Sequence, residues 1–168
     1  MIRQVDIKDT KDICDIYNHY VTQTIITFEE SPVDVDEMEY RVSEIASELP
    51  WLVFEDNQQI LGYSYASRWK SRCAYRYSVE GTVYVSPSFT NRKIGTQLYA
   101  QLIHILKENN FHSVIGGIAL PNLLSIKLHE KFGFEMVAQF KEVGRKFEKW
   151  IDVAYWQLKL TNAEQTVV

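Results

Sequence analysis

Several features are missing from this sequence, and each absence removes a class of protein. The chain has only two cysteines, Cys14 and Cys73, without C-x-x-C spacing. We therefore expect no disulfide framework and no zinc site, and a reducing compartment. No apolar run approaches the roughly 18 residues of a membrane-spanning helix, and the N-terminus opens directly into a patterned segment without a signal peptide. These absences predict a cytoplasmic protein with no membrane partner and no bound metal.

Strong charge of one sign is also missing. The 168 residues carry a formal net charge of −4, so the chain lacks the basic surface with which proteins bind nucleic acid, and any anion site must be local. The sequence shows no internal repeats, low-complexity tracts or linkers, and its length fits one domain with a sizeable core. We expect this domain to cover residues 1–160 and a polar tail to occupy 161–168.

Hydrophobic periodicity predicts a mixed order of helices and strands. Apolar residues at helical spacing follow Asp9, which we expect to cap a first helix. A second apolar stripe follows the capping-box-like pair Asp34 and Glu37 and stops at Pro50. A third helix, 94–109, lies between two β-rich runs, which predicts one β-α-β crossover. The other expected elements are strands at 2–5, 51–55, 60–67, 75–86, 114–119, 134–143 and 151–160, a hairpin turn at 56–59, and a helix that opens at Pro121 and closes at Gly133.

The segment 83–96 joins a β-rich run to a long amphipathic helix through a polar loop. Helix N-termini carry unpaired N–H groups and a partial positive charge, and they therefore accept phosphate groups. Arg92 and Lys93 fall at this helix start, where cations are unfavourable by about 0.3–1 kcal/mol each unless an anion is bound. The loop therefore indicates an anion site, although solvated surface charges explain the two residues equally well.

Four segments resemble one enzyme family. They are 15–20 (DIYNHY), 79–85 (VEGTVYV), 122–134 (NLLSIKLHEKFGF) and 143–147 (VGRKF) followed by Trp150 and Asp152. Together they resemble the GCN5-related N-acetyltransferase superfamily and, within it, the phosphinothricin acetyltransferase-like family, over residues 2–160. The resemblance implies an α+β sandwich, in which a mixed, mostly antiparallel sheet of about six or seven strands is flanked by about four helices.

The resemblance also implies an activity and an assembly. The activity is transfer of an acetyl group from acetyl-CoA to the amino group of a small amino-acid-like substrate, of the phosphinothricin or methionine sulfoximine type. The family is dimeric, so we expect a homodimer. Phe147 and Trp150 are large apolar residues that fit no buried stripe in the sequence, and exposed apolar residues of this kind are typical of an interface.

The superfamily's pyrophosphate loop reads Q/R-x-x-G-x-G/A, and it corresponds to 90–95 here, where only Gly95 matches. Thr90 replaces the usual Gln or Arg, and Lys93 replaces the first Gly. Backbone N–H groups make most of the contacts to the pyrophosphate, and a change of side chain leaves them in place unless Lys93 must adopt a positive φ. By the resemblance, Val83 and Val85 offer backbone groups to the pantetheine arm as an added strand would.

Asn122 would bind the same arm, although simple capping of a helix explains this residue too. The residues expected to bind acetyl-CoA are Val83, Tyr84, Val85, Asn91, Arg92, Lys93, Ile94, Gly95, Thr96, Asn122 and Leu128.

Glu80 is the predicted catalytic base. An amine must be neutral to attack a thioester, so a base, usually acting through water, must accept its proton. Glu80 lies in an otherwise apolar and aromatic strand, where burial raises the pKa of a carboxyl group, and the matching Glu lines the substrate site in the family. Gly81 beside it suggests a close backbone approach. The alternative is a structural carboxylate paired with Arg72 or Arg76.

His129 is the second predicted catalytic residue. Many superfamily members carry here a Tyr that acts as general acid toward the CoA sulfur, and the phosphinothricin-type proteins resemble this chain in having His. An imidazole with a pKa near neutrality can do the same work. A histidine that packs on a helix face without chemistry explains the residue equally well.

An amino-acid substrate offers a carboxylate, and arginine is well shaped to bind carboxylate or phosphinate groups. A basic cluster of Arg68, Lys70, Arg72 and Arg76 precedes Glu80, although a solvated loop is an equal alternative. By the resemblance, the segments equivalent to 70–72 and 80–82 line the substrate pocket. The expected substrate-binding residues are Phe28, Glu30, Lys70, Ser71, Arg72, Arg76, Glu80, Gly81 and Thr82.

Two other functions remain open at this point. Acetylation of a polyamine or of a protein N-terminus would use the same chemistry, but the basic cluster would repel a polycation. The altered pyrophosphate loop also keeps open a non-catalytic sensor that binds acetyl-CoA without turnover. Turnover of an amine would separate the enzymes from the sensor.

Overall fold

The computed structural model describes residues 1–160, and the predicted tail at 161–168 lies outside the described residues. Short 3₁₀ turns at Ile7–Asp9, Cys73–Tyr75 and Pro87–Phe89 connect some of the elements. Within the described range, the helices and strands follow one another in the order that the sequence predicts. They are β1 (Ile2–Gln4), α1 (Thr10–Gln23), α2 (Val35–Ala46), β2 (Trp51–Asp56), β3 (Gln59–Arg68), β4 (Ser78–Val85), α3 (Ile94–Glu108), β5 (Ser113–Ala119), α4 (Leu123–Lys131), β6 (Glu135–Lys146) and β7 (Lys149–Lys159).

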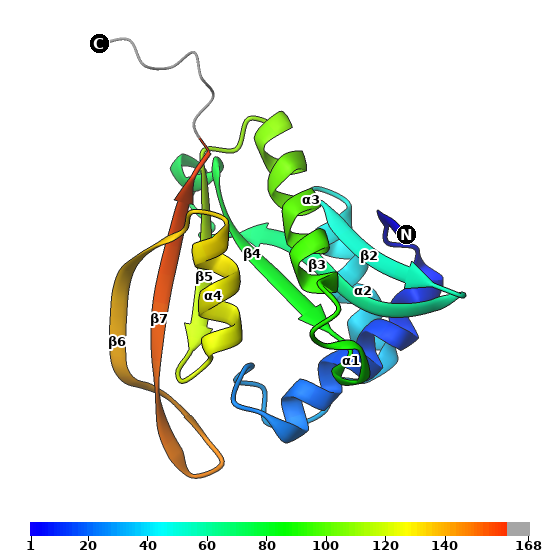
Figure 1. Ribbon diagram of the computed structural model, residues 1–168, viewed down its shortest axis with the longest axis horizontal. Coiled ribbons are helices and arrows are strands. Elements are labelled where there is room, and N and C mark those ends of the chain that lie inside the picture. The colour runs from blue at the N-terminus through cyan, green and yellow to red at the C-terminus, as the bar shows by residue number, and fades with distance from the viewer. Residues whose placement is uncertain (161–168) are drawn as a thin grey trace.

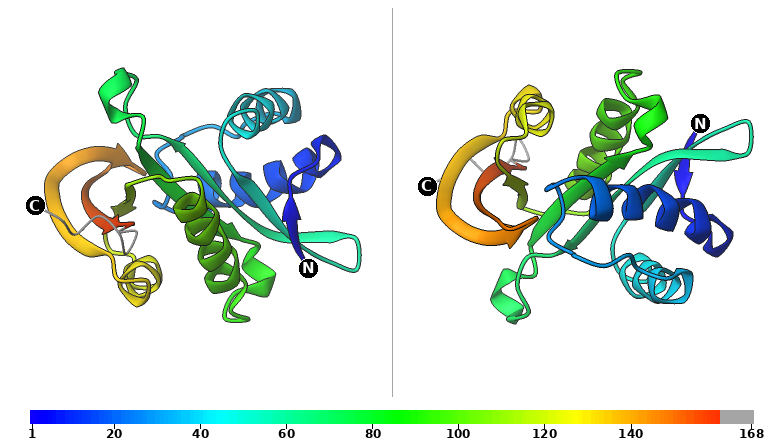
Figure 2. Two further views of the ribbon diagram at one scale, coloured as in Figure 1. Left: turned by 90° about the horizontal axis from the view of Figure 1, so that it is seen from above. Right: turned by 90° about the horizontal axis from the view of Figure 1, so that it is seen from below.

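A single sheet of seven strands lies between two pairs of helices. Its strand order is β1-β2-β3-β4-β5-β7-β6 (Figure 1). The helices α1 and α2 cover one face, and α3 and α4 cover the other (Figure 2). All neighbouring strands are antiparallel except β4 and β5, which are parallel and joined through α3. The α+β sandwich and the single β-α-β crossover are therefore confirmed.

The alternation of side chains along β2 connects both halves of the core. Trp51 and Val53 pack with α1 and α2, whereas Leu52 belongs to the apolar cluster under α3 and α4. Leu98 and Leu102 of α3 are fully buried in that second cluster. Each such side chain contributes about 1.5–3 kcal/mol through burial. Apolar packing on both faces therefore holds the middle strands in place.

Two helix boundaries differ from the sequence-based expectation. Asp9 was expected to cap α1, but its carboxylate instead accepts two hydrogen bonds from the Arg3 guanidinium, at 2.6 and 2.8 Å. An ion pair therefore replaces the cap. The second helix begins as predicted, with Asp34 accepting from Glu37 N–H at 2.8 Å, but it ends at Ala46, before Pro50.

Two strand boundaries also differ. The strand expected from residue 75 begins at Ser78, because a 3₁₀ turn occupies Cys73–Tyr75. The strands β6 and β7 form one hairpin that reaches further than predicted, and its turn residues Phe147 and Glu148 have positive φ values of 50° and 60°. A Phe-Glu turn carries none of the Asn or Gly signals that mark such hairpins.

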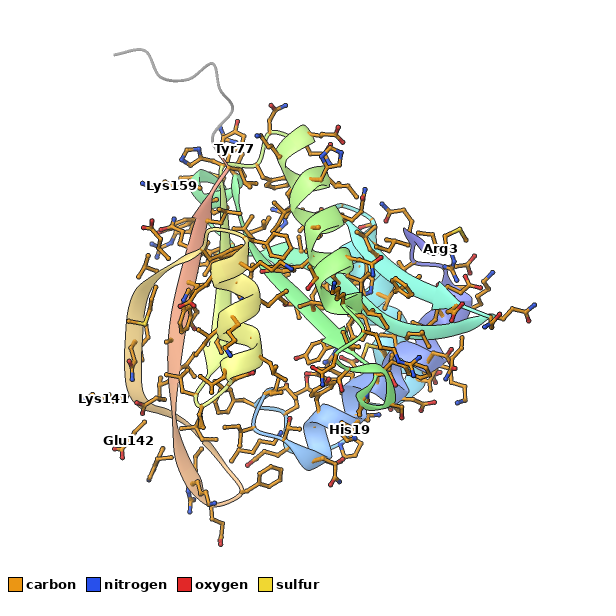
Figure 3. All side chains as sticks on the ribbon, viewed as in Figure 1. Arg3, His19, Tyr77, Lys141, Glu142 and Lys159 are labelled. Carbon is orange, nitrogen blue, oxygen red and sulfur yellow. The ribbon has the colours of Figure 1, made fainter. Side chains whose placement is uncertain are left out.

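The strands β4 and β5 diverge, and this divergence shapes the functional region. Parallel pairing joins only residues 78–80 of β4 to 113–115 of β5, although both strands continue beyond it. The paired end lies near Tyr77, and the strands open toward the end of α1 that carries His19 (Figure 3). Past Glu80 the facing edges have no strand partner, so a wedge opens in the middle of the sheet. Within residues 1–160, no helix is both long and apolar enough to cross a bilayer.

Candidate functional site

The wedge between β4 and β5 exposes backbone groups of β4. Ser86 N–H donates to the Leu61 carbonyl of β3 at 2.8 Å. Because backbone groups alternate in direction along an antiparallel pair, the backbone groups of Val83 and Val85 face the wedge. The Val85 carbonyl already accepts a hydrogen bond from the Tyr20 hydroxyl at 2.6 Å. The free groups of Val83 therefore point where an added strand, or an extended ligand, would lie.

A cleft of about 710 Å³ extends from the wedge to the N-terminus of α3 and along α4. Of the residues predicted to bind acetyl-CoA, only Arg92 does not line it. The Arg92 guanidinium lies instead 5.0 Å from the centre of the Phe89 ring. The predicted residues that line the cleft are Val83, Tyr84, Val85, Asn91, Lys93, Ile94, Gly95, Thr96, Asn122 and Leu128.

The loop before α3 has an unusual backbone. Asn91 and Lys93 adopt φ values of 63° and 62°, and Lys93 is the N-cap of the helix. A left-handed conformation costs a residue with a side chain about 1–2 kcal/mol, so Lys93 occupies the conformation that a glycine would adopt freely. Gly95 follows, where a Cβ would lie 3.3 Å from Val85 Cγ2. The positive φ that makes the replacement of glycine by Lys93 unfavourable is therefore present, so the loop holds its path toward the predicted anion site at a cost in backbone strain.

Sequence reasoning missed two cations of this cleft. Lys127 and Lys131 of α4 line it, as do His19 and Tyr20 of α1. The two lysines are four residues apart, so a helical reading places them on one face of α4. That spacing was the signal available in the sequence.

A second cavity, of about 680 Å³, adjoins the cleft through Val83, Tyr84 and Asn122, which line both. It contains both predicted catalytic residues. Of the residues predicted to bind the substrate, it includes Phe28, Glu30, Glu80, Gly81 and Thr82. We call it the acceptor cavity.

Glu80 lies at the apex of the wedge, where it is the last residue of β4 paired with β5. Burial raises the pKa of its carboxyl group, and the nearby charge of Lys70 partly offsets this effect. No residue in the described range forms an ion pair with it; Arg76 instead donates to the Cys73 carbonyl at 3.1 Å. The structural pairing with Arg72 or Arg76 that the sequence left open is therefore absent from residues 1–160.

His129 is buried, and both of its ring nitrogens are engaged. Its Nδ1 lies 2.8 Å from the Ser125 carbonyl, which can only accept, so we assign the proton to Nδ1. Its Nε2 then accepts from the Tyr99 hydroxyl at 3.0 Å. Burial lowers the pKa of the imidazole, so the ring is neutral near pH 7. This geometry gives no support to proton donation by His129 and favours the packing role that the sequence left open.

Asn122 caps α4, since its side-chain oxygen accepts from Ser125 N–H at 3.1 Å. Its amide nitrogen donates to no residue in the range 1–160. Because Asn122 lines both the cleft and the acceptor cavity, one side chain can cap the helix and still offer a donor to a ligand. The two readings of this residue are compatible.

The basic cluster is not brought into the acceptor cavity. Lys70, Arg72 and Arg76 line a separate hollow of about 370 Å³, and Arg68 pairs with Glu48. Ser71 lines neither cavity. A 3₁₀ turn and the late start of β4 direct this loop away from Glu80. Only Lys70 keeps an electrostatic link to the site, through its effect on the Glu80 pKa.

Glycines on β5 and β6 make room for the site, and sequence reasoning missed them. A Cβ on Gly116 would lie 2.3 Å from His129 Nε2, and one on Gly117 would lie 3.3 Å from Glu80 Oε1. Gly144 accommodates the ring of Phe28 in the same way. The paired glycines inside an apolar strand were a signal of close approach, but not of which neighbour approaches. Within residues 1–160, no group of three or more His, Cys, Asp or Glu side chains is arranged for a metal ion.

Comparison with known proteins adds an independent finding. The family model described as an acetyltransferase (GNAT) domain matches residues 2–155. A phosphinothricin N-acetyltransferase of Streptomyces coelicolor is 40% identical, covering 91% of this chain and 92% of its own length. An L-methionine sulfoximine/L-methionine sulfone acetyltransferase of Salmonella typhimurium is 35% identical, covering 95% and 94%. A crystal structure of a phosphinothricin acetyltransferase from Sinorhizobium meliloti in complex with acetyl-CoA has a TM-score of 0.92 at 32% identity, covering 99% of this chain and 94% of that one.

Proposed function

Because the chain belongs to the GNAT family of acetyltransferases, we propose that it transfers an acetyl group from acetyl-CoA to the amino group of a small amino-acid-like substrate. The substrate class is that of phosphinothricin and methionine sulfoximine. One observation carries the proposal. Glu80 lies with a raised pKa at the apex of a wedge whose two sides lead into adjoining cavities. One cavity suits an extended anionic donor, and the other suits a small polar acceptor.

The donor would be held mainly by backbone groups. The N–H groups of the first turn of α3 have no partner within the helix and attract a diphosphate. The left-handed residues Asn91 and Lys93 shape the loop around that position, and the free backbone groups of Val83 suit the amides of a pantetheine arm. Lys127 and Lys131 add positive charge along the cleft. When bound, acetyl-CoA supplies a thioester carbonyl that an amine can attack.

Glu80 would accept the proton of the attacking amine, directly or through one water molecule. Its raised pKa favours a base that works near neutral pH, because a more basic carboxylate takes up a proton more readily. The Val83 N–H, which faces the wedge, is suited to hydrogen-bond the carbonyl oxygen as negative charge develops on it. As the amide bond forms, the C–S bond of the thioester would break, and the CoA thiolate would take its proton from solvent, because His129 would position the site through Tyr99 rather than donate a proton.

The acceptor would be recognised by the walls of its cavity. Phe28 offers an apolar surface, and Glu30 and Glu80 offer carboxylates to an ammonium group. Lys70 lines a separate hollow, so it would act on the site only through the effect of its charge on Glu80 and would not contact the substrate. The cavity also contains Arg145, which the sequence-based set of residues omits.

A homodimer is the proposed assembly. The edge strand β6 and its hairpin expose six large apolar side chains, which is more than a monomer usually leaves exposed in one region. These residues are Met136, Val137, Phe140, Val143, Phe147 and Trp150.

An amine panel with acetyl-CoA, read by release of free thiol, tests the proposed function. The panel contains phosphinothricin, methionine sulfoximine, methionine sulfone, ordinary amino acids and spermidine. We expect turnover of the first three and none of spermidine. Preference for spermidine would overturn the substrate class, and acetyl-CoA binding without turnover of any amine would favour the sensor.

A further inference from the structure

Lys146 is a buried lysine that the proposed reaction does not use. It is the last residue of β6, its side chain is 2% exposed, and its Nζ donates to the Thr27 carbonyl at 2.7 Å. Burial lowers the pKa of this ammonium group, and Glu30 and Glu29 act in the opposite direction. No carboxylate in the range 1–160 forms an ion pair with it. A buried ammonium without an ion-pair partner is unfavourable. A role for the hydrogen bond to Thr27 therefore explains the burial of Lys146 better than packing alone.

The bond of Lys146 ends on a loop that side chains hold, among them Tyr17, whose hydroxyl lies 2.9 Å from Thr27 Oγ1. Residues 24–34 connect α1 to α2 without regular structure. In the described chain, the backbone of 25–33 forms no hydrogen bond with other backbone groups. Side chains hold it instead: Asn18 bonds both backbone groups of Val33, and Arg41 bonds Glu29. Those anchors come from α1 and α2, so Lys146 is the polar anchor from the opposite side.

A second contact joins the same two segments. The ring of Phe28 occupies the space beside Gly144, where an added Cβ would overlap three of its carbons. Gly144 and Lys146 are two residues apart on β6, so they face the same side of the strand. The loop is therefore fixed to β6 at neighbouring points, by a hydrogen bond at Thr27 and by ring packing at Phe28.

The fixed loop forms part of the acceptor cavity, because Ile26, Thr27, Phe28 and Glu30 line it together with Glu80. We propose that Lys146 is a positioning residue that fixes the 24–34 loop as a wall of the acceptor cavity and thereby sets the affinity for the amine. The residues predicted to hold the donor lie on β4, on the loop before α3, and on α3 and α4; of the 24–34 loop, only Ile26 also lines the donor cleft. Only the identity of the ligand as an amine rests on the proposed function.

The variant Lys146→Met tests this role, and Lys149→Met is its matched control. Met keeps most of the length of the lysine side chain and removes its donor. Lys149 is exposed and pairs with Lys146 across the hairpin, so the control makes the same change of charge one strand away. With methionine sulfoximine as the acceptor, we expect Lys146→Met to raise its KM about tenfold or more, and Lys149→Met to leave it within about twofold. The dissociation constant of acetyl-CoA should stay within about twofold in both variants.

A KM for the amine equal to that of the wild type would overturn the proposal. A parallel loss of acetyl-CoA affinity would also overturn it, because general damage to the fold would then explain the result. Gly144→Ala provides a second test, since it displaces Phe28 and leaves every charge in place. It should raise the same KM if Lys146→Met fails to fold.

Amide hydrogen exchange keeps this proposal separate from the proposed function. We expect exchange of the loop amides that donate to side chains, those of Ile26, Glu29 and Val33, to accelerate about tenfold or more in Lys146→Met relative to Lys149→Met, with α1 and α2 unchanged. If the wild type acetylates no amine, the proposed function fails, but this measurement still decides whether Lys146 fixes the loop. Unchanged exchange would refute the anchoring.

Discussion

Glu80 shows how one residue acquires its chemistry from its surroundings. It lies at the last paired position of diverging strands, half-buried, with no ion-pair partner among residues 1–160. Burial raises its pKa, and Gly117 leaves space in front of its carboxylate. A glutamate in this setting remains available as a base, because its carboxylate is not engaged in an ion pair.

Replacing Glu80 by Gln should lower kcat by about 100-fold or more, which is the usual contribution of a general base. Gln has nearly the same size, so the wedge and the donor cleft should be unchanged. The test combines steady-state thiol release with a binding titration of acetyl-CoA. Near-normal turnover would remove Glu80 from the mechanism, and lost acetyl-CoA binding would mean that the substitution damaged the cleft.

The same substitution should change stability in a way that depends on pH. Because the pKa of Glu80 is raised in the folded protein, the folded state retains this proton more tightly than the unfolded chain. Stability therefore falls as pH rises from the ordinary glutamate pKa of about 4.3 through the raised value. Glu80→Gln should accordingly have a higher Tm than the wild type near pH 7 and no such advantage below about pH 4. An equal advantage at both pH values would contradict this explanation.

At the scale of elements, two adjacent glycines of β5 make space for different side chains. A Cβ on Gly116 would lie 2.3 Å from the buried His129 ring, whereas one on Gly117 would meet its nearest atoms at 3.2 and 3.3 Å. We expect Gly116→Ala to destabilise the fold by about 1–3 kcal/mol, as overpacking does. Gly117→Ala should cost less than about 1 kcal/mol but should lower kcat, because it crowds Glu80. Urea denaturation and thiol release separate the two effects, and equal stability losses would refute the distinction.

The sequence predicted the elements well where local signals decide them. Asp34 marks the start of α2 because its side chain bonds Glu37 N–H, and the apolar stripe of α3 matches its buried face. Asp9 has the same local signature of a cap, but a distant partner, Arg3, binds its carboxylate instead. Local rules therefore fail where a residue far along the chain competes for the same group.

The candidate site was predictable in its loop and strand but not in its packing. The segments 80–85 and 91–96 could be assigned to the site by resemblance, because each is a continuous stretch of sequence that can be matched to a family motif. The roles of Gly116, Gly144 and Lys146 depend on which side chain approaches each of them, and a single sequence does not contain that information. The basic loop was placed at the substrate because it precedes Glu80, but a short 3₁₀ turn redirects it.

At the scale of the whole molecule, the exposed apolar face of β6 predicts self-association. Val137 is 56% exposed on this edge strand, and it lies outside both cavities. We expect the wild type to sediment as a dimer at micromolar concentration and Val137→Lys to shift toward the monomer, since a charge on an edge strand opposes pairing. Acetyl-CoA binding should persist in the variant. A monomeric wild type would refute this assembly.

The two halves of the sandwich meet at the wedge, and the proposed acetyl transfer depends on the ligand that fills it. The sheet is closed at Tyr77 and open past Glu80, so an extended ligand can complete the broken pairing while its anionic end lies at the start of α3. Proton transfer at Glu80 and acetyl transfer to the amine both require that ligand.

Calorimetric titration of the purified chain with acetyl-CoA tests this claim most directly. We expect saturable binding at one site per chain, with a dissociation constant between about 1 μM and 1 mM, the range in which most enzyme KM values lie. We also expect Glu80→Gln to bind with the same affinity. Absence of saturable binding up to about 1 mM acetyl-CoA would contradict the account, because the wedge would then hold no donor for any amine to attack.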